Sequence, residues 1–298
     1  MSQFKNYLSL VKFSHTLFAL PFAMIGFFLG VFAQQSTGIN STQTDSVLWI
    51  RFLLVLLCMV TARSAAMAFN RFLDRHFDAR NPRTAIREIP RGIIAPNSAL
   101  RLVIVCCILF TLSCWLINPL CFYLSPVALF VILFYSYTKR FTALCHVVLG
   151  IGLSLAPIGA FLAVTGRFEL LPLLFSGAVI CWVSGFDIIY AMQDVDFDKS
   201  ENLYSIPTAV GKIQSLRIST LLHIFCILFV VAAGRVGGFG AWYWIGILLF
   251  AGMLVYQHLI VKPHDLSRVN LAFMTTNGIA SVVFALFVIT DIVMTHKH

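Results

Sequence analysis

The sequence predicts an all-α integral membrane protein, with about nine transmembrane helices in a single bundle and two cytoplasmic loops that cap a central cavity. Hydrophobic residues make up 59% of the 298-residue chain and charged residues only 11%, and the mean hydropathy is +0.90. Soluble domains carry about 25% charged residues. Nine apolar stretches are each long enough to cross a hydrocarbon core of about 30 Å. The basic residues gather in alternate connecting segments.

The nine predicted spans follow one another along the chain. No convincing small-residue cleavage site follows the first span, which indicates a retained helix rather than a cleaved signal. Asn118-Pro119 is the turn signal between the third and fourth spans, which would otherwise read as one long helix. The spans cover residues 12–33, 47–69, 98–116, 119–138, 143–165, 171–192, 215–234, 240–261 and 268–292.

The distribution of positive charge predicts the orientation. With the N-terminus in the cytoplasm, 16 of the 21 Lys and Arg residues fall in cytoplasmic segments, as the positive-inside rule requires. An odd number of spans then places the C-terminus on the other side. Because the net charge of +9 lies at the membrane surface, it favours contact with membrane lipids and argues against nucleic acid as a partner.

Two acidic motifs stand where an apolar span runs into a polar loop: Asn70-x-x-x-Asp74-x-x-x-Asp78 and Tyr190-x-x-x-Asp194-x-x-x-Asp198. Carboxylates spaced i, i+4 at a helix end project from one face, and like charges repel unless a cation lies between them. Mg²⁺ binds one or two carboxylates and completes its shell with water and substrate phosphates. The sequence therefore predicts that Mg²⁺ is the cofactor. Its predicted ligands, and the predicted catalytic residues, are Asn70, Asp74, Asp78, Asp194 and Asp198.

Both motifs open long cytoplasmic loops, at about 70–97 and about 193–214, and each loop continues into basic residues and a proline. This weak repeat predicts two motifs that face each other across a cavity.

Further candidates for substrate binding lie near the motifs. Arg75, Lys139 and Arg140 are placed to bind a diphosphate, because arginine makes bidentate contacts with phosphate. Arg63 and Asp187 are charges inside apolar spans, which usually face a cavity. Tyr190 and His15 complete the predicted substrate-binding set.

These residues resemble the UbiA superfamily of intramembrane prenyltransferases, in its 4-hydroxybenzoate polyprenyltransferase-like branch. The first family motif is matched by Asn70, Asp74 and Asp78, and the second by the run from Asp187 to Asp198. One departure is Arg71, where many members have Asp. The resemblance covers residues 1–298 as one domain. Further matching stretches are Asn81-Pro-Arg-Thr84 and Tyr137-Thr-Lys-Arg-Phe-Thr142.

The resemblance implies Mg²⁺-dependent transfer of a polyprenyl group from polyprenyl diphosphate to an aromatic hydroxy acid in quinone biosynthesis. It also implies a bacterial inner membrane location and an acid–base part for Asp194. The segments 18–22 and 63–70 resemble a subgroup linked to menaquinone synthesis by the futalosine route. The acceptor therefore stays open between 4-hydroxybenzoate, for ubiquinone, and a dihydroxynaphthoate, for menaquinone.

Two other functions use clustered carboxylates and divalent cations. A CDP-alcohol-type phosphotransferase needs the signature D-x-x-D-G-x-x-A-R, which the sequence lacks. A divalent-cation transporter would carry its carboxylates near the middle of the membrane, whereas these motifs stand at the ends of spans.

Overall fold

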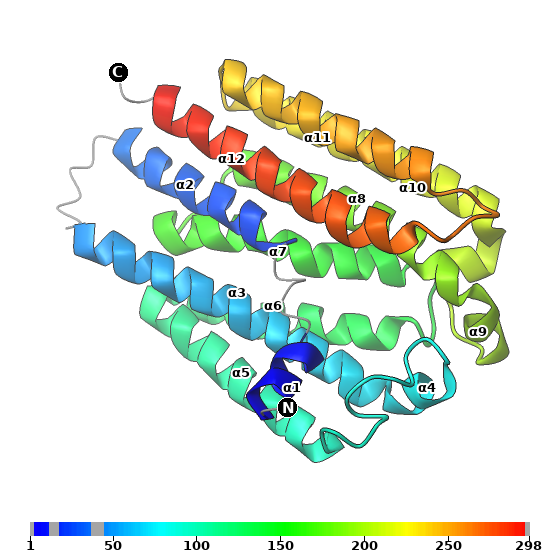
Figure 1. The fold of residues 1–298 in the computed structure, drawn as a ribbon. Helices are drawn as coiled ribbons and strands as arrows, with labels where there is room; N and C mark the ends of the chain where they lie inside the picture. Colours follow the sequence, from blue (N-terminus) through cyan, green and yellow to red (C-terminus); the bar gives the residue numbers. More distant parts are fainter. Residues whose placement is uncertain (1–2, 12–17, 37–44, 296–298) are drawn as a thin grey trace.

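The computed structural model describes residues 3–11, 18–36 and 45–295. Its helices run side by side in one bundle (Figure 1). Eight described helices are long and apolar enough to cross a membrane, and the shorter apolar α2 (Leu20–Ser36) makes a ninth, which confirms the predicted fold class. The eight are α3 (Asp45–Leu73), α5 (Pro96–Ile117), α6 (Pro119–Thr138), α7 (Cys145–Thr165), α8 (Leu170–Ala191), α10 (Ile206–Val236), α11 (Ala241–Ile260) and α12 (Asn277–Thr295).

The two predicted loops contain helices of their own. The first holds α4 (Arg75–Arg80), and the second holds the 3₁₀ turn η2 (Met192–Asp194) and α9 (Val195–Ser200). Figure 1 places α4 and α9 at the same end of the bundle, opposite the C-terminal end of α12. Both acidic motifs therefore lie at one end.

The second loop is shorter than predicted, because α10 begins at Ile206 rather than near 215. Ser205 caps the helix by a reciprocal pair of hydrogen bonds with Thr208, a capping box that supplies partners for otherwise free backbone groups. Gly211 then takes φ +77°, which breaks the helical path. The apolar pattern gave only the part of α10 after this kink.

Close helix packing depends on small residues. A Cβ added at Gly26 would lie 2.0 Å from the Pro157 carbonyl oxygen, so α2 and α7 touch backbone to backbone. A Cβ at Gly150 would lie 2.7 Å from the Ile180 carbonyl oxygen of α8. Such contacts let membrane helices approach closely.

The largest apolar core surrounds the fully buried Trp182 of α8. Phe22, Phe250 and Phe284 bring α2, α11 and α12 onto it, with ring centroids 5.0 to 6.5 Å apart. The π-helical segment η3 (Leu271–Thr276) leads into α12. A smaller core joins α1 (Gln3–Leu10) to α3 and α5.

Candidate active site

A polar cavity of about 660 Å³ lies where α3 and α8 end, and both acidic motifs line it. The first motif continues the helical turns beyond α3: the Asp74 N–H donates to the Asn70 carbonyl at 2.9 Å, and the Asp78 N–H donates to the Asp74 carbonyl at 2.8 Å. Asn70 Nδ2 also donates to Asp74 Oδ2 at 3.1 Å. The three side chains therefore share one face of the chain.

Each motif aspartate forms an ion pair with a different basic residue. These partners come from the segment after α4 and from the end of α6, so the pairs tie separate parts of the chain together. The pairs are Arg140–Asp74 at 2.8 Å, Arg87–Asp78 at 2.6 Å, Lys139–Asp198 at 2.7 Å, and Arg83–Asp194.

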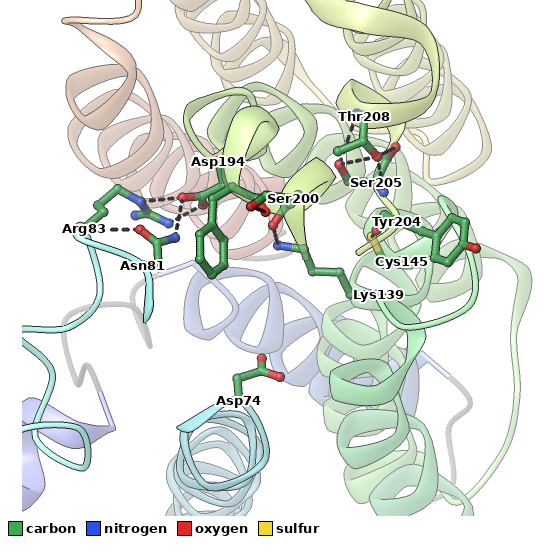
Figure 2. A network of polar contacts seen from close by, with 12 residues as sticks. Asp74, Asn81, Arg83, Lys139, Cys145, Asp194, Ser200, Tyr204, Ser205 and Thr208 are labelled. Atoms are coloured by element: carbon green, nitrogen blue, oxygen red, sulfur yellow. Dashed lines mark hydrogen bonds and ion pairs between the residues drawn. The ribbon is translucent and has the colours of Figure 1, made fainter. Parts of the chain in front are cut away.

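Asp194 contacts the side chains of both Arg83 and Asn81 (Figure 2). Arg83 donates to both of its oxygens, and Asn81 Nδ2 donates to Oδ1 at 3.1 Å. Arg83 also donates to the hydroxyl of Tyr190 at 2.7 Å. Asp74 lies apart from this group in the same view. The two motifs thus hold separate sets of partners within one cavity.

Burial and pairing act on the ionisation of these groups. Burial raises the pKa of Asp74 above its usual range, against the opposing effect of Arg140. Burial lowers the pKa of Arg83, but the hydrogen bonds to Asp194 and Tyr190 outweigh it and raise the pKa overall. Arg83 therefore stays a cation, and Asp74 protonates more readily than usual as the pH falls.

Several buried polar atoms of the cavity lack a hydrogen-bond partner. Asp78 Oδ2 and both Asp198 oxygens receive no hydrogen bond, although Lys139 lies within ion-pair distance of Asp198. Three buried nitrogen donors also lack a hydrogen-bond partner: Arg71 Nε, Arg71 Nη1 and Arg63 Nε. Because buried polar groups normally have partners, free acceptors and free donors in one cavity indicate a ligand that carries both a cation and anionic oxygens.

The residues fit Mg²⁺ bound together with a diphosphate. Within the described residues no three His, Cys, Asp or Glu side chains cluster closely enough to hold a metal ion by themselves. Asp78 Oδ2 and Asp198 Oδ2, which have no partner among the described residues, nevertheless offer the hard oxygen ligands that Mg²⁺ requires, and this ion commonly uses one or two carboxylates plus substrate phosphates.

The remaining predicted site residues differ in their placement. Asp187 lines the cavity beside His146, and Tyr190 stacks on Phe273 with ring centroids 4.2 Å apart. Arg75 does not line the cavity, because its guanidinium lies over the Phe72 ring and donates to the Phe72 carbonyl at 2.7 Å. His15 lies outside the described residues.

The basic residues predicted to bind the diphosphate were Arg75, Lys139 and Arg140. The predicted site did not include four residues that the structure adds to it: Asn81, Arg83, Arg87 and His146. The stretch Asn81-Pro-Arg-Thr84 was a usable signal, since it supplies two of the partners of Asp194. No sequence motif around His146 predicted a role in the site, because its position against α8 depends on how the helices pack.

A second, apolar cavity of about 310 Å³ lies between α3, α5, α6 and α7. It shares Arg63, Tyr135 and Leu149 with the polar cavity. A polar chamber at the end of the bundle therefore adjoins an apolar chamber within it, and Arg63 stands at the junction.

Comparison with known proteins gives a consistent result. The sequence model of the UbiA prenyltransferase family matches residues 19–279. The 4-hydroxybenzoate octaprenyltransferase of Nitrosospira multiformis is 31% identical over 233 residues, which cover 78% of this chain and 80% of that protein. The protein of the same name from Aeromonas salmonicida is 31% identical over 222 residues, 74% of this chain and 76% of its own length.

Solved structures share the fold. A UbiA homolog from Aeropyrum pernix K1 matches with a TM-score of 0.77 and 28% identity, over 94% of this chain and 98% of its own. A UbiA homolog from Archaeoglobus fulgidus bound to DMAPP and Mg²⁺ matches with a TM-score of 0.69 and 19% identity, over 97% and 99% of the two chains. At that lower identity the second match shows the fold alone.

Proposed function

The chain belongs to the UbiA prenyltransferase family and is an integral membrane prenyltransferase, and on that premise we propose its reaction and site. It transfers a polyprenyl group from polyprenyl diphosphate to the ring of an aromatic hydroxy acid in quinone biosynthesis. The observation that carries this proposal is the junction of the two cavities at Arg63, Tyr135 and Leu149. A donor with an anionic head and an apolar tail matches a polar chamber that adjoins an apolar one.

In this proposal the diphosphate lies between the two acidic motifs. Asp74, Asp78, Asp194 and Asp198, with Asn70, would hold Mg²⁺, and this ion would supply positive charge to the diphosphate. The free oxygens of Asp78 and Asp198 support this assignment.

The basic residues of the cavity position the diphosphate. Lys139 and Arg140 are paired with Asp198 and Asp74 before the substrate arrives, so these cations sit beside the place where phosphate oxygens bind. Arg71 has buried donors without partners, which suits an additional oxyanion contact. Pre-positioned cations stabilise charge that develops on a leaving group without having to reorganise.

The reaction then proceeds by loss of the diphosphate. The allylic C–O bond breaks and its electron pair leaves with the diphosphate, so an allylic carbocation forms at the junction. The ring carbon beside the phenol oxygen donates its π electrons to form the new C–C bond, and the ring then loses a proton. Arg63 binds the acceptor carboxylate, since its Nε is buried without a partner at that junction.

The acceptor is 4-hydroxybenzoate or a dihydroxynaphthoate. The curated relatives carry 4-hydroxybenzoate in their names, which favours the former. The end of the bundle that holds both motifs is the cytoplasmic end of an inner-membrane protein, because the basic residues gather there and inner-membrane loops follow the positive-inside rule.

The test is a transfer assay with purified full-length protein in lipid. Parallel reactions contain a polyprenyl diphosphate, Mg²⁺ and either 4-hydroxybenzoate or 1,4-dihydroxy-6-naphthoate, with EDTA as the control. We expect Mg²⁺-dependent prenylation of one acid. Transfer to neither acid would contradict the proposed function, and EDTA-resistant transfer would contradict the metal assignment.

A further inference from the structure

Two carboxylates that line the polar cavity, Asp187 and Glu88, form no ion pair with an arginine or lysine of the described residues. Asp187 of α8 faces the cavity, and its partner is the imidazole of His146 on α7, with Nδ1 2.7 Å from Asp187 Oδ2. The His146 side chain is 3% exposed and the Asp187 side chain 23%. The carboxylate therefore stands in front, toward any ligand, and the imidazole stands behind it.

The backbone fixes the tautomer of His146. The N–H of Ile206 points to His146 Nε2 at 3.4 Å, and a backbone N–H can only donate. Nε2 is then the acceptor, so Nδ1 carries the hydrogen and donates it to Asp187 Oδ2. The other carboxylate oxygen, Oδ1, has no hydrogen-bond partner among the described residues. His146 thus holds one oxygen of the carboxylate and leaves the other for the cavity.

Close packing of α7 on α8 keeps this pair in place. Gly150, one helical turn after His146, lets the backbone approach Ile180. The Ser184 hydroxyl is fully buried and lies within hydrogen-bond distance of the His146 carbonyl, at 3.2 Å, and the Ile180 carbonyl, at 2.6 Å. Groups held by packing and by partners behind them keep the geometry that catalysis needs.

The motif aspartates of the cavity are already engaged with basic side chains. Each motif aspartate is bound to an arginine or lysine, and Asp194 receives donors from both Arg83 and Asn81. For Asp194 these donors outweigh the effect of burial and lower the pKa, so this carboxylate is a weaker base. Glu88 accepts from Ser9, on the side of the cavity next to α1. Asp187 instead has an imidazole partner, which contacts Oδ2 alone.

Asp187 also lies beside the place where the ring would react. His146 and Asp187 line the polar cavity with Leu149, which belongs to both chambers. The guanidinium of Arg63, at the same junction, interacts electrostatically with Asp187 and Tyr135. An acceptor whose carboxylate binds Arg63 therefore has its ring near Asp187.

We propose that Asp187 is the base that removes the ring proton after the C–C bond forms, and that His146 is the positioning residue that aims its free oxygen. The inference rests on the proposed prenyl transfer. The C–H bond breaks, its electron pair restores the aromatic ring, and the proton goes to Asp187 Oδ1. The protonated Asp187 then passes this proton to the released diphosphate or to water.

The experiment measures transfer with acceptor deuterated on the ring carbons beside the hydroxyl. Asp187→Asn should lower kcat by about 10²- to 10⁴-fold, the usual contribution of a general base, and should show a kinetic isotope effect because proton removal becomes slow. The KM for the prenyl diphosphate should stay unchanged. A large loss of kcat without an isotope effect would overturn the assignment of Asp187 as the base.

The role of His146 is tested by two substitutions. His146→Gln keeps a donor for Asp187 and should retain most of the activity, whereas His146→Leu removes the donor and should lower kcat with an isotope effect. His264→Gln is the matched control, since it changes an exposed histidine outside both cavities. Equal activity of the Gln and Leu variants of His146 would overturn the positioning role. If the wild-type protein transfers to neither acid, the proposed function itself fails, and the two failures are thus distinguishable.

Discussion

The bundle buries two polar clusters that differ in how fully their atoms are paired. In the cavity cluster, oxygens of Asp78 and Asp198 and nitrogens of Arg63 and Arg71 lack partners. The second cluster, which we call the core network, lies between α8, α10, α11 and α12 and consists of neutral side chains that bond one another. Its members are Trp182, His223, Gln257, His258 and Asn277.

The core network has a consistent donor and acceptor for each link. Trp182 Nε1 donates to Asn277 Oδ1 at 2.9 Å, and Asn277 Nδ2 donates to Gln257 Oε1 at 3.1 Å. His223 Nε2 faces the Trp182 carbonyl at 3.3 Å, so Nδ1 is free to accept from Gln257 and His258. A fully satisfied network rigidifies a core, whereas a cluster with unpaired atoms is prepared for a ligand. The comparison predicts that substitutions in the cavity cluster lower activity, whereas substitutions in the core network lower stability.

The largest effect is expected in the cavity cluster. Asp194→Ala, or Asp74→Ala, should abolish transfer, since each removes a proposed metal ligand and releases a cation from its pair. Removal of one group that stabilises developing charge costs about 10²- to 10³-fold in kcat, and a lost metal ligand should cost at least that. The protein should still insert and keep its thermal transition. The measurement is transfer by purified protein, with Asp265→Ala as a control outside the cavities; near-normal turnover of Asp194→Ala would contradict the comparison.

A smaller effect is expected at the junction of the chambers. Arg63→Met should raise the KM for the aromatic acid and leave the KM for the prenyl diphosphate unchanged. A hydrogen bond to a charged group contributes about 1.5–3 kcal/mol, which corresponds to roughly ten- to a hundredfold. Arg51→Met is the control, because Arg51 lies on the same helix but donates to the Val164 carbonyl at 3.2 Å. A change in the KM of the diphosphate alone would place Arg63 in the donor site instead.

Substitutions in the core network should lower the stability of the protein and leave its catalytic activity unchanged. Asn277→Leu leaves Trp182 Nε1 and Gln257 Oε1 unpaired, and an unsatisfied buried group costs about 1–3 kcal/mol. We expect a lower thermal transition in detergent with substrate KM values close to those of the wild type. Gln214→Leu, an amide on the exposed surface of α10, should leave the transition unchanged. Loss of transfer in Asn277→Leu without loss of stability would assign the core network a functional part.

The sequence predicted the transmembrane helices well because each needs only a long apolar run, which is a local property. It also predicted that the two acidic motifs would meet, from their equal positions at span ends. It missed the break at Gly211 and the early start of α10, since these depend on single-residue backbone conformation and capping. The pairing of Asp78 with Arg87 and of His146 with Asp187 was not predictable, because each joins residues through tertiary packing.

The smallest effect on transfer is expected from substitution of Arg75. This prediction tests whether a basic residue next to the motif in the sequence also contacts the substrate. Arg75 follows Asp74 directly, yet its guanidinium packs on the Phe72 ring at 4.7 Å and binds the Phe72 carbonyl. Arg75→Met should cost no more than the roughly 0.5–1 kcal/mol of an exposed cation–π contact, with kcat and both KM values near those of the wild type. Arg83→Met, which breaks the contacts to Asp194 and Tyr190, should lose most of the transfer under the same conditions. A comparable loss in Arg75→Met would mean that this guanidinium leaves Phe72 and turns to the diphosphate when substrate binds, as its position in the motif first predicted.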